Sequence, residues 1–129
     1  MNDDRTVIST SDAPAAMGPY NQAIVANGMV FAAGQTPIDP ATGSLVDGDI
    51  TVQTHRVFDN LTAVLAAAGS SIDRACHVRV FLRSMDDFAA MNAVYRERVR
   101  EPHPARTTVA VAGLPADALV EIDVIALVG

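Results

Sequence analysis

The chain has 129 residues, half of them hydrophobic, and this length and composition predict one globular domain spanning residues 1–129. A formal net charge of −6 argues against a nucleic-acid-binding protein, which needs a basic surface for phosphates. All nine basic residues are arginines, so a lysine Schiff base, ordinary pyridoxal-phosphate chemistry and a Walker-type phosphate loop are excluded.

Cysteine and histidine offer little for a metal site. The lone cysteine, Cys76, excludes an internal disulfide and a multi-cysteine zinc site; it opens an apolar alternation, so we expect a buried structural thiol. The three histidines, His55, His77 and His103, lack a ligand-like spacing, and we expect neither a metal nor another cofactor. Residues 1–11 are polar and no apolar run reaches membrane-span length, which predicts a cytoplasmic protein without membrane contact.

The predicted elements begin with a short strand over residues 5–9, followed by a Pro/Gly-rich loop over residues 13–20. Two strands, residues 23–26 and 29–33, then flank Asn27-Gly28. This dipeptide best fits a type I′ hairpin turn because both positions tolerate a positive φ.

An apolar stripe at helical spacing predicts a first helix from about residue 51 to residue 68, with Gly69 placed to end it. The stripe consists of Val52, Val57, Leu61, Val64, Leu65 and Ala68. Residues 76–83 alternate between apolar and other side chains, which predicts a strand. Ser84 and Asp87 resemble a capping box that opens a second helix. That helix carries Met85, Phe88, Met91, Val94 or Tyr95, and Val99, and it ends before Pro102 and Pro104.

Two strands, residues 106–111 and 119–127, close the chain. Helices between strands favour crossover connections, so we predict an α+β fold with a mixed six-stranded sheet and both helices on one face. The other face of the last strand carries Glu121 and Asp123 among apolar residues. A two-helix layer covers one face only, so we infer that the second face packs against other copies of the chain, the alternative being a solvent-facing sheet.

Three side chains are candidates for chemistry. Arg106 begins a strand directly after Pro104-Ala105, and an arginine fork matches a carboxylate through two parallel hydrogen bonds. Without further information, pairing of Arg106 with a nearby Asp or Glu at a subunit contact is the more common role. Glu121 lies in a strongly apolar strand, where a carboxyl group serves in proton transfer or as an arginine partner. Tyr20 lies on a loop, and its ring either borders a pocket or only packs over neighbouring side chains.

Segments along nearly the whole chain resemble motifs of the Rid family (reactive intermediate deaminases, also called YjgF-like). The segments are residues 13–20 (A-P-A-A-M-G-P-Y), 27–37, 58–61 with 67–69, 91–95, 104–109 (P-A-R-T-T-V) and 114–115 with 120–123. The resemblance implies a fold like that of the small trimeric chorismate mutases. It also implies a homotrimer with an active site in each cleft between subunits.

The resemblance also implies residue roles. Arg106 stands where the family places the arginine that binds the substrate carboxylate, and Glu121 where it organises the hydrolytic water. Tyr20 matches the tyrosine that borders the cleft, and the backbone around Gly34 lines it. Asn92 matches an asparagine of the second-helix motif, for which a structural role is expected.

Two positions depart from the family pattern. Thr108 replaces a cysteine that often follows the arginine by two positions, so thiol chemistry is not expected, and Thr108 becomes a substrate-binding candidate. Ala33 replaces a frequent serine, which removes a possible hydroxyl ligand. Both changes bear on pocket polarity and substrate range.

The implied function is hydrolysis of 2-aminoacrylate and 2-imino acids to 2-keto acids and ammonia, without a cofactor. We expect Arg106 and Glu121 to have the same strand parity and to act on one small carboxylate substrate. The alternatives are a non-catalytic binding or regulatory module for 2-keto acids and a deaminase for a larger enamine of catabolic origin. A nuclease or chaperone role gains little support from an acidic chain.

Overall fold

Two α-helices and a mixed six-stranded sheet make up the fold of the computed structural model, which describes residues 4–129. Residues 1–3, part of the polar N-terminal stretch, lie outside the described range. The sheet strands are β1 (Thr6–Ile8), β2 (Ala23–Ala26), β3 (Met29–Gln35), β6 (Ala75–Leu82), β7 (Ala105–Ala110) and β8 (Val120–Leu127). The helices are α1 (Ile50–Ala67) and α2 (Phe88–Arg98), and β4 (Ile38–Asp39) pairs with β5 (Ser44–Leu45) in a separate ladder.

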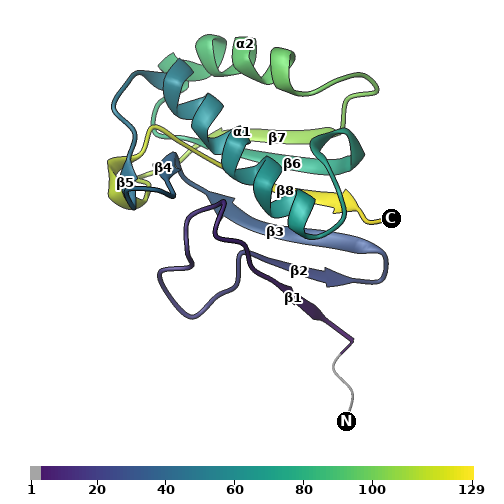
Figure 1. Ribbon diagram of the computed structural model, residues 1–129. Coiled ribbons are helices and arrows are strands. Elements are labelled where there is room, and N and C mark those ends of the chain that lie inside the picture. The colour runs from purple at the N-terminus through teal and green to yellow at the C-terminus, as the bar shows by residue number, and fades with distance from the viewer. Residues whose placement is uncertain (1–3) are drawn as a thin grey trace.

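Both helices cover the same face of the sheet, whose strand order is β1-β2-β3-β8-β6-β7 (Figure 1). Strands β6 and β7 are parallel, since α2 carries the chain back between them, and every other neighbouring pair in this sheet is antiparallel. The predicted α+β class, mixed six-stranded sheet and one-sided helix layer are therefore confirmed. Strand β7 lies at the edge of the sheet, beneath α2.

The core lies between the helices and the sheet. Val57, Leu61, Val64 and Leu65 of α1 are fully buried, as the predicted stripe requires. They pack in one apolar cluster with the helix-facing residues of the central strands, Val78, Val80, Leu82, Val120, Ile122 and Val124. Burial of each such side chain contributes about 1.5–3 kcal/mol, so this layer fixes how α1 lies on the sheet.

Local backbone signals are confirmed at the turns. Asn27 and Gly28 have φ values of 51° and 73°, as a type I′ hairpin turn requires. Asp49 caps α1, since its side chain accepts a hydrogen bond of 3.1 Å from the Val52 backbone N–H, and Gly69 follows the helix with a φ of 76°.

Three expected core positions are exposed instead. Val52 lies in the first turn of α1 and is 45% exposed, and Met85 is 49% exposed because a short 3₁₀ turn precedes α2, which begins at Phe88. The prediction of a buried Cys76 thiol is wrong as well. The pairing of β6 with β8 shifts register between Ala75 and His77, and this bulge leaves Cys76 on the surface.

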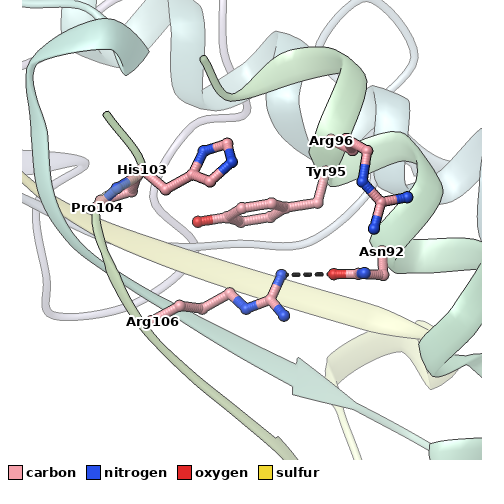
Figure 2. A pocket seen from close by; sticks show the side chains of 6 residues that line it. All are labelled: Asn92, Tyr95, Arg96, His103, Pro104 and Arg106. Atoms are coloured by element: carbon pink, nitrogen blue, oxygen red, sulfur yellow. Dashed lines mark hydrogen bonds between the residues drawn. The ribbon is translucent and has the colours of Figure 1, made fainter. Parts of the chain in front are cut away.

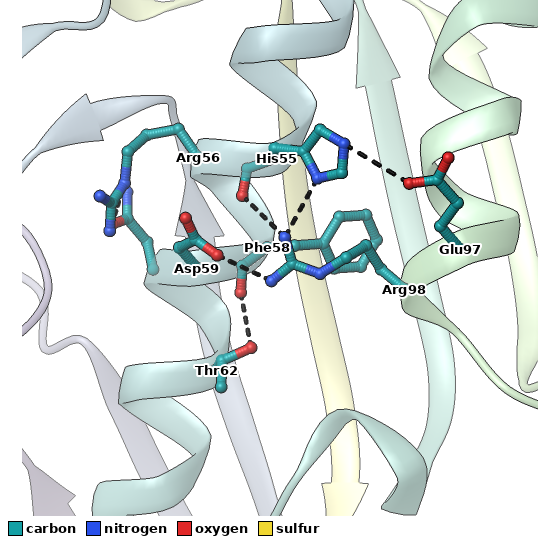
Figure 3. A network of polar contacts seen from close by, with 8 residues as sticks. His55, Arg56, Phe58, Asp59, Thr62, Glu97 and Arg98 are labelled. Carbon is teal, nitrogen blue, oxygen red and sulfur yellow. Dashed lines mark hydrogen bonds and ion pairs between the residues drawn. The ribbon is translucent and has the colours of Figure 1, made fainter.

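Arg98 fastens α2 to α1 (Figure 3). Its guanidinium donates to Oδ1 of Asp59 at 2.8 Å and to the backbone carbonyl of His55 at 3.3 Å, and it lies 5.6 Å from the centre of the Phe58 ring. Glu97 lies 3.7 Å from Nε2 of the same histidine. These contacts fix the position of α2 over β7, on which the candidate site depends.

The face of the sheet away from the helices carries several exposed apolar side chains. They are Val7, Phe31, Val109 and Leu127. Asp123 lies among them and accepts two hydrogen bonds from Arg79, of 2.9 and 2.7 Å. We call this surface the open face. Within residues 4–129, neither helix has the length and apolar character needed to cross a membrane, and the cytoplasmic location stays a prediction.

Candidate functional site

Arg106 lies on the helix-covered side of β7, directly beneath α2. Its register opposite Val78 puts it on the same side of the sheet as the buried residues of β6. The guanidinium donates a 2.8 Å hydrogen bond to Oδ1 of Asn92. Its central carbon lies 4.5 Å from the ring centre of Tyr95 and 5.8 Å from that of Phe88. One amide oxygen and two ring faces therefore fix the direction of the guanidinium.

A cavity of about 220 Å³ opens beside this guanidinium (Figure 2). Its lining residues are Asn92, Tyr95, Arg96, His103, Pro104 and Arg106. None of them is acidic, and Arg106 forms no ion pair with any carboxylate of residues 4–129. Within the described residues Arg106 therefore has no carboxylate partner, and its pairing with an acidic residue at a subunit contact, the alternative role considered from the sequence, stays a hypothesis.

Tyr95 places a buried hydroxyl group at this cavity. The residue is 6% exposed, and its hydroxyl oxygen has no hydrogen-bond partner among the described residues. Burial raises the pKa of the phenol, and the nearby Arg106 charge opposes that rise. The group therefore stays a neutral hydrogen-bond donor that no described residue uses.

A second group of candidate residues gathers around Gly34, where β3 bulges between Ala32 and Gln35. Gly34 lies against the Glu121 side chain, and Gly34 and Tyr20 line a small cavity of about 40 Å³. The Tyr20 hydroxyl accepts a 3.2 Å hydrogen bond from the Met17 backbone N–H, which holds the ring over the loop. The structure thus places Gly34 against Glu121 and, at the small cavity, with Tyr20.

The carboxyl group of Glu121 lies half-buried on the open face. Burial raises its pKa above the ordinary range, and the negative charge of Asp123, two residues along β8, raises it further. A pKa raised toward neutral pH suits a group that takes a proton from water and later returns it.

The two groups lie on opposite faces of the sheet. Glu121 pairs with Phe81, whereas Arg106 pairs with Val78, and these two β6 residues point to opposite sides. The expectation that Arg106 and Glu121 share one parity is therefore wrong. Parity counted along separate strands says nothing about faces until the register between the strands is known.

Thr108 shares the face of Arg106 but does not line its cavity. Its hydroxyl is buried, again without a hydrogen-bond partner in the described part of the chain. Asn92 has the positioning contact already described, which fits the structural role expected for it. Across residues 4–129, no group of three or more His, Cys, Asp or Glu side chains is placed to hold a metal ion.

Sequence reasoning did not identify Tyr95, Arg96 and His103 as cavity residues. The available signal was spacing, because Asn92, Tyr95 and Arg96 stand at i, i+3 and i+4 and so share one face of α2.

Comparison with known proteins identifies the family. A family model described as Endoribonuclease L-PSP matches residues 10–128. A RutC family protein of Pyrococcus horikoshii is 51% identical over 122 residues, which cover 95% of this chain and 97% of that protein. Yersinia pestis YyfA, a protein of the conserved Rid family, is 45% identical with a TM-score of 0.93, covering 96% and 99% of the two chains.

A further solved structure contains a small ligand. Escherichia coli TdcF, whose crystal structure was determined with bound serine, is 36% identical, with a TM-score of 0.89 and coverage of 96% of this chain and 99% of TdcF. The family model and these relatives span nearly the entire chain, in agreement with the motifs found in the sequence. The chain belongs to the Rid, or YjgF-like, family.

Proposed function

We propose that the protein hydrolyses 2-imino acids and their enamine tautomers, such as 2-aminoacrylate, to 2-keto acids and ammonia. The observation that carries this proposal is Arg106, whose oriented guanidinium faces a cavity without a carboxylate partner in the described chain. A guanidinium binds a carboxylate through two parallel hydrogen bonds, and it stays charged at any working pH.

The relative with bound serine supports a small carboxylate as the ligand. Serine carries a carboxylate on the carbon that bears its nitrogen, as a 2-imino acid does. In this chain, Arg106 takes that carboxylate. Tyr20 and the backbone of Gly34 border the reacting end.

The reaction consumes one water molecule and releases one ammonia molecule. An enamine first gains a proton at its terminal carbon and loses one from its nitrogen, which gives the imine. Water then adds to the imine carbon; Glu121 accepts a proton from this water and passes it to the imine nitrogen. In the resulting carbinolamine the hydroxyl proton moves to the amino nitrogen, the carbonyl group forms, the C–N bond breaks and ammonia leaves. Orientation and proton transfer are the contributions required, and no cofactor is invoked.

A second copy of the chain completes the site in this proposal. Arg106 and Glu121 lie on opposite faces of the sheet in one subunit, so one small ligand cannot contact both within the chain. In this proposal the open face of one subunit packs along the β7 edge of the next in a homotrimer, which brings Glu121 of the first to Arg106 of the second and covers exposed apolar side chains such as Phe31 and Val109.

The first experiment measures turnover. L-alanine and an amino-acid oxidase generate 2-iminopropanoate in situ, and its loss is followed with and without the protein. We expect loss above the buffer rate for the wild type and a strong decrease for Arg106→Ala. A wild-type rate equal to that of buffer rejects the activity.

The second experiment tests the shared site. Arg106→Ala and Glu121→Ala chains are each inactive alone, but random co-assembly leaves about a quarter of the clefts with both side chains intact. Recovery of about that share of activity supports a site shared between subunits. The double variant Arg106→Ala/Glu121→Ala is the matched control and stays inactive. No recovery in the mixed assembly rejects the shared site.

The competing function is carboxylate binding without turnover, as in a regulatory module. The bound serine in TdcF favours it, and so does Thr108, whose buried hydroxyl has no hydrogen-bond partner in the described part of the chain. Saturable binding of pyruvate in calorimetry, together with no imine hydrolysis, identifies this function. Neither candidate includes ribonuclease activity, since a chain of net charge −6 has little to attract phosphates.

A further inference from the structure

A second guanidinium group lines the cavity beside Arg106. Figure 2 shows the Arg96 side chain reaching from α2 toward the side of the cavity where Arg106 meets Asn92. The Arg96 guanidinium makes no hydrogen bond, ion pair or ring contact with any described residue. The next two arginines along the chain differ, since Arg98 binds Asp59 at 2.8 Å and Arg100 lies 3.8 Å from Asp73.

The cavity holds unbalanced positive charge. Two guanidinium groups repel each other, and no acidic side chain lines the cavity to offset them. This contrasts with the chain as a whole, which carries 15 acidic and 9 basic residues. A ligand with one carboxylate offsets one of these charges, whereas a ligand with two offsets both.

A buried donor in the same cavity is a second, independent sign of a ligand. Tyr95 is more than nine-tenths buried, its hydroxyl is unpartnered among the described residues, and His103 lines the same cavity (Figure 2). Buried polar groups are nearly always hydrogen-bonded, so a partner from outside the chain is the physical explanation for this hydroxyl. Thus Tyr95 and Arg96 both offer hydrogen bonds that the described chain does not accept.

We propose that the preferred substrate is a short 2-imino dicarboxylate. Arg106 binds the carboxylate next to the imine carbon, and Arg96 binds the second carboxylate. This inference rests on the proposed deaminase function and names its substrate class. A volume of about 220 Å³ suits such a compact molecule, since pockets for drug-sized ligands span about 300–1,000 Å³.

Binding tests the inference without requiring turnover. The matched probes are 2-oxoglutarate and 2-oxopentanoate, keto acids of equal chain length that differ in the terminal carboxylate. In calorimetry we expect 2-oxoglutarate to bind the wild type about tenfold or more tightly, as for one added charge-assisted contact. Arg96→Ala should abolish this preference, and Arg96→Lys should retain part of it.

Arg100→Ala is the matched control, because it removes a positive charge near the same end of α2 but outside the cavity lining. It should keep the preference for 2-oxoglutarate. Equal binding of the two probes to the wild type overturns the inference. An undiminished preference in Arg96→Ala, or an equal loss in Arg100→Ala, overturns it as well.

Turnover separates this inference from the proposed function. Imines of glutamate and norvaline are generated in situ by oxidases, and the ratio of their kcat/KM values is measured. A ratio above one that falls about tenfold in Arg96→Ala supports the inference. Hydrolysis of the norvaline imine with no preference for the glutamate imine rejects the dicarboxylate assignment and leaves the deaminase proposal standing. Binding of 2-oxoglutarate that depends on Arg96, without hydrolysis of either imine or of 2-iminopropanoate, rejects the deaminase proposal and supports the cavity assignment.

Discussion

A Cβ atom added to Gly34 would lie 2.6 Å from Oε2 of Glu121 and 2.9 Å from its carboxyl carbon. Real Cβ contacts are essentially never shorter than 3.0 Å, so the missing side chain of Gly34 is what allows the carboxyl group to lie there. The backbone of β3 at Gly34 and the carboxyl group of Glu121 on β8 are therefore packed directly against each other.

Gly34→Ala should move the Glu121 carboxylate and lower kcat/KM for 2-iminopropanoate by about tenfold or more, as removal of a positioned proton-transfer group does. The half-exposed side chain has room to turn away, so the loss in unfolding free energy should stay near 1 kcal/mol. Imine-loss kinetics and urea unfolding measure the two effects. Gly113→Ala is the control, since nothing lies within 4 Å of its added Cβ. Full activity in Gly34→Ala would contradict a role for the present carboxylate position.

The planar, two-donor geometry of the Arg106 guanidinium should contribute to activity in addition to its charge. Arg106→Lys keeps a positive charge but loses the two parallel donors and the planar contact with Tyr95, so we expect kcat/KM to fall about 10- to 100-fold. Asn92→Ala should cause a smaller loss, because it removes the acceptor that orients the fork but not the fork itself. Steady-state kinetics with 2-iminopropanoate measures both. If the lysine variant were as active as the wild type, only the positive charge of Arg106 would contribute to activity.

The elements of this fold were readable from the sequence because each depends on local pattern. Val120, Ile122 and Val124 alternate with less apolar residues, and the structure buries all three beneath the helices. Asn27-Gly28 fixes its turn through its own backbone preferences. Chain order and periodicity were therefore sufficient for the architecture.

Relations between elements were not readable in the same way. The faces of Arg106 and Glu121 depend on how β7 and β8 pair with β6, which the spacing within each strand does not encode. Cys76 is exposed because the pairing of β6 with β8 shifts by one residue at this position. Arg96 is exposed like Arg100, and the cavity that it lines also includes His103 and Pro104, which lie beyond the end of α2, so helix periodicity does not reveal the cavity.

The open face should control assembly. Val109 is 41% exposed there, on the edge strand β7, and Val109→Asp puts a charge where the proposed trimer needs apolar packing. We expect a shift from trimer to monomer in sedimentation velocity and a parallel loss of imine hydrolysis. Val52→Asp is the control, because Val52 is similarly exposed but lies on α1, outside the open face. An active Val109→Asp monomer would contradict the shared site.

Because the pKa of Glu121 is raised in the folded chain, ionisation of this residue lowers the free energy of unfolding at neutral pH. In the unfolded chain the carboxyl group ionises at its ordinary pKa, whereas burial and Asp123 delay ionisation in the folded chain. Below the unfolded pKa, both states hold the proton and the folded state has no disadvantage. The disadvantage grows as the pH rises through the unfolded pKa, and it is complete above the folded one.

Glu121→Gln removes this cost, because glutamine stays neutral at every pH. The variant should therefore have a higher Tm than the wild type at about pH 8, and the gain should vanish toward about pH 3, while imine hydrolysis is lost throughout. Thermal unfolding measured across that pH range tests the sign. Glu101→Gln, at an exposed position, corrects for the general loss of one negative charge. A Tm gain that is constant with pH would point to packing rather than to ionisation, and a lower Tm at high pH would show that a partner stabilises the ionised carboxylate.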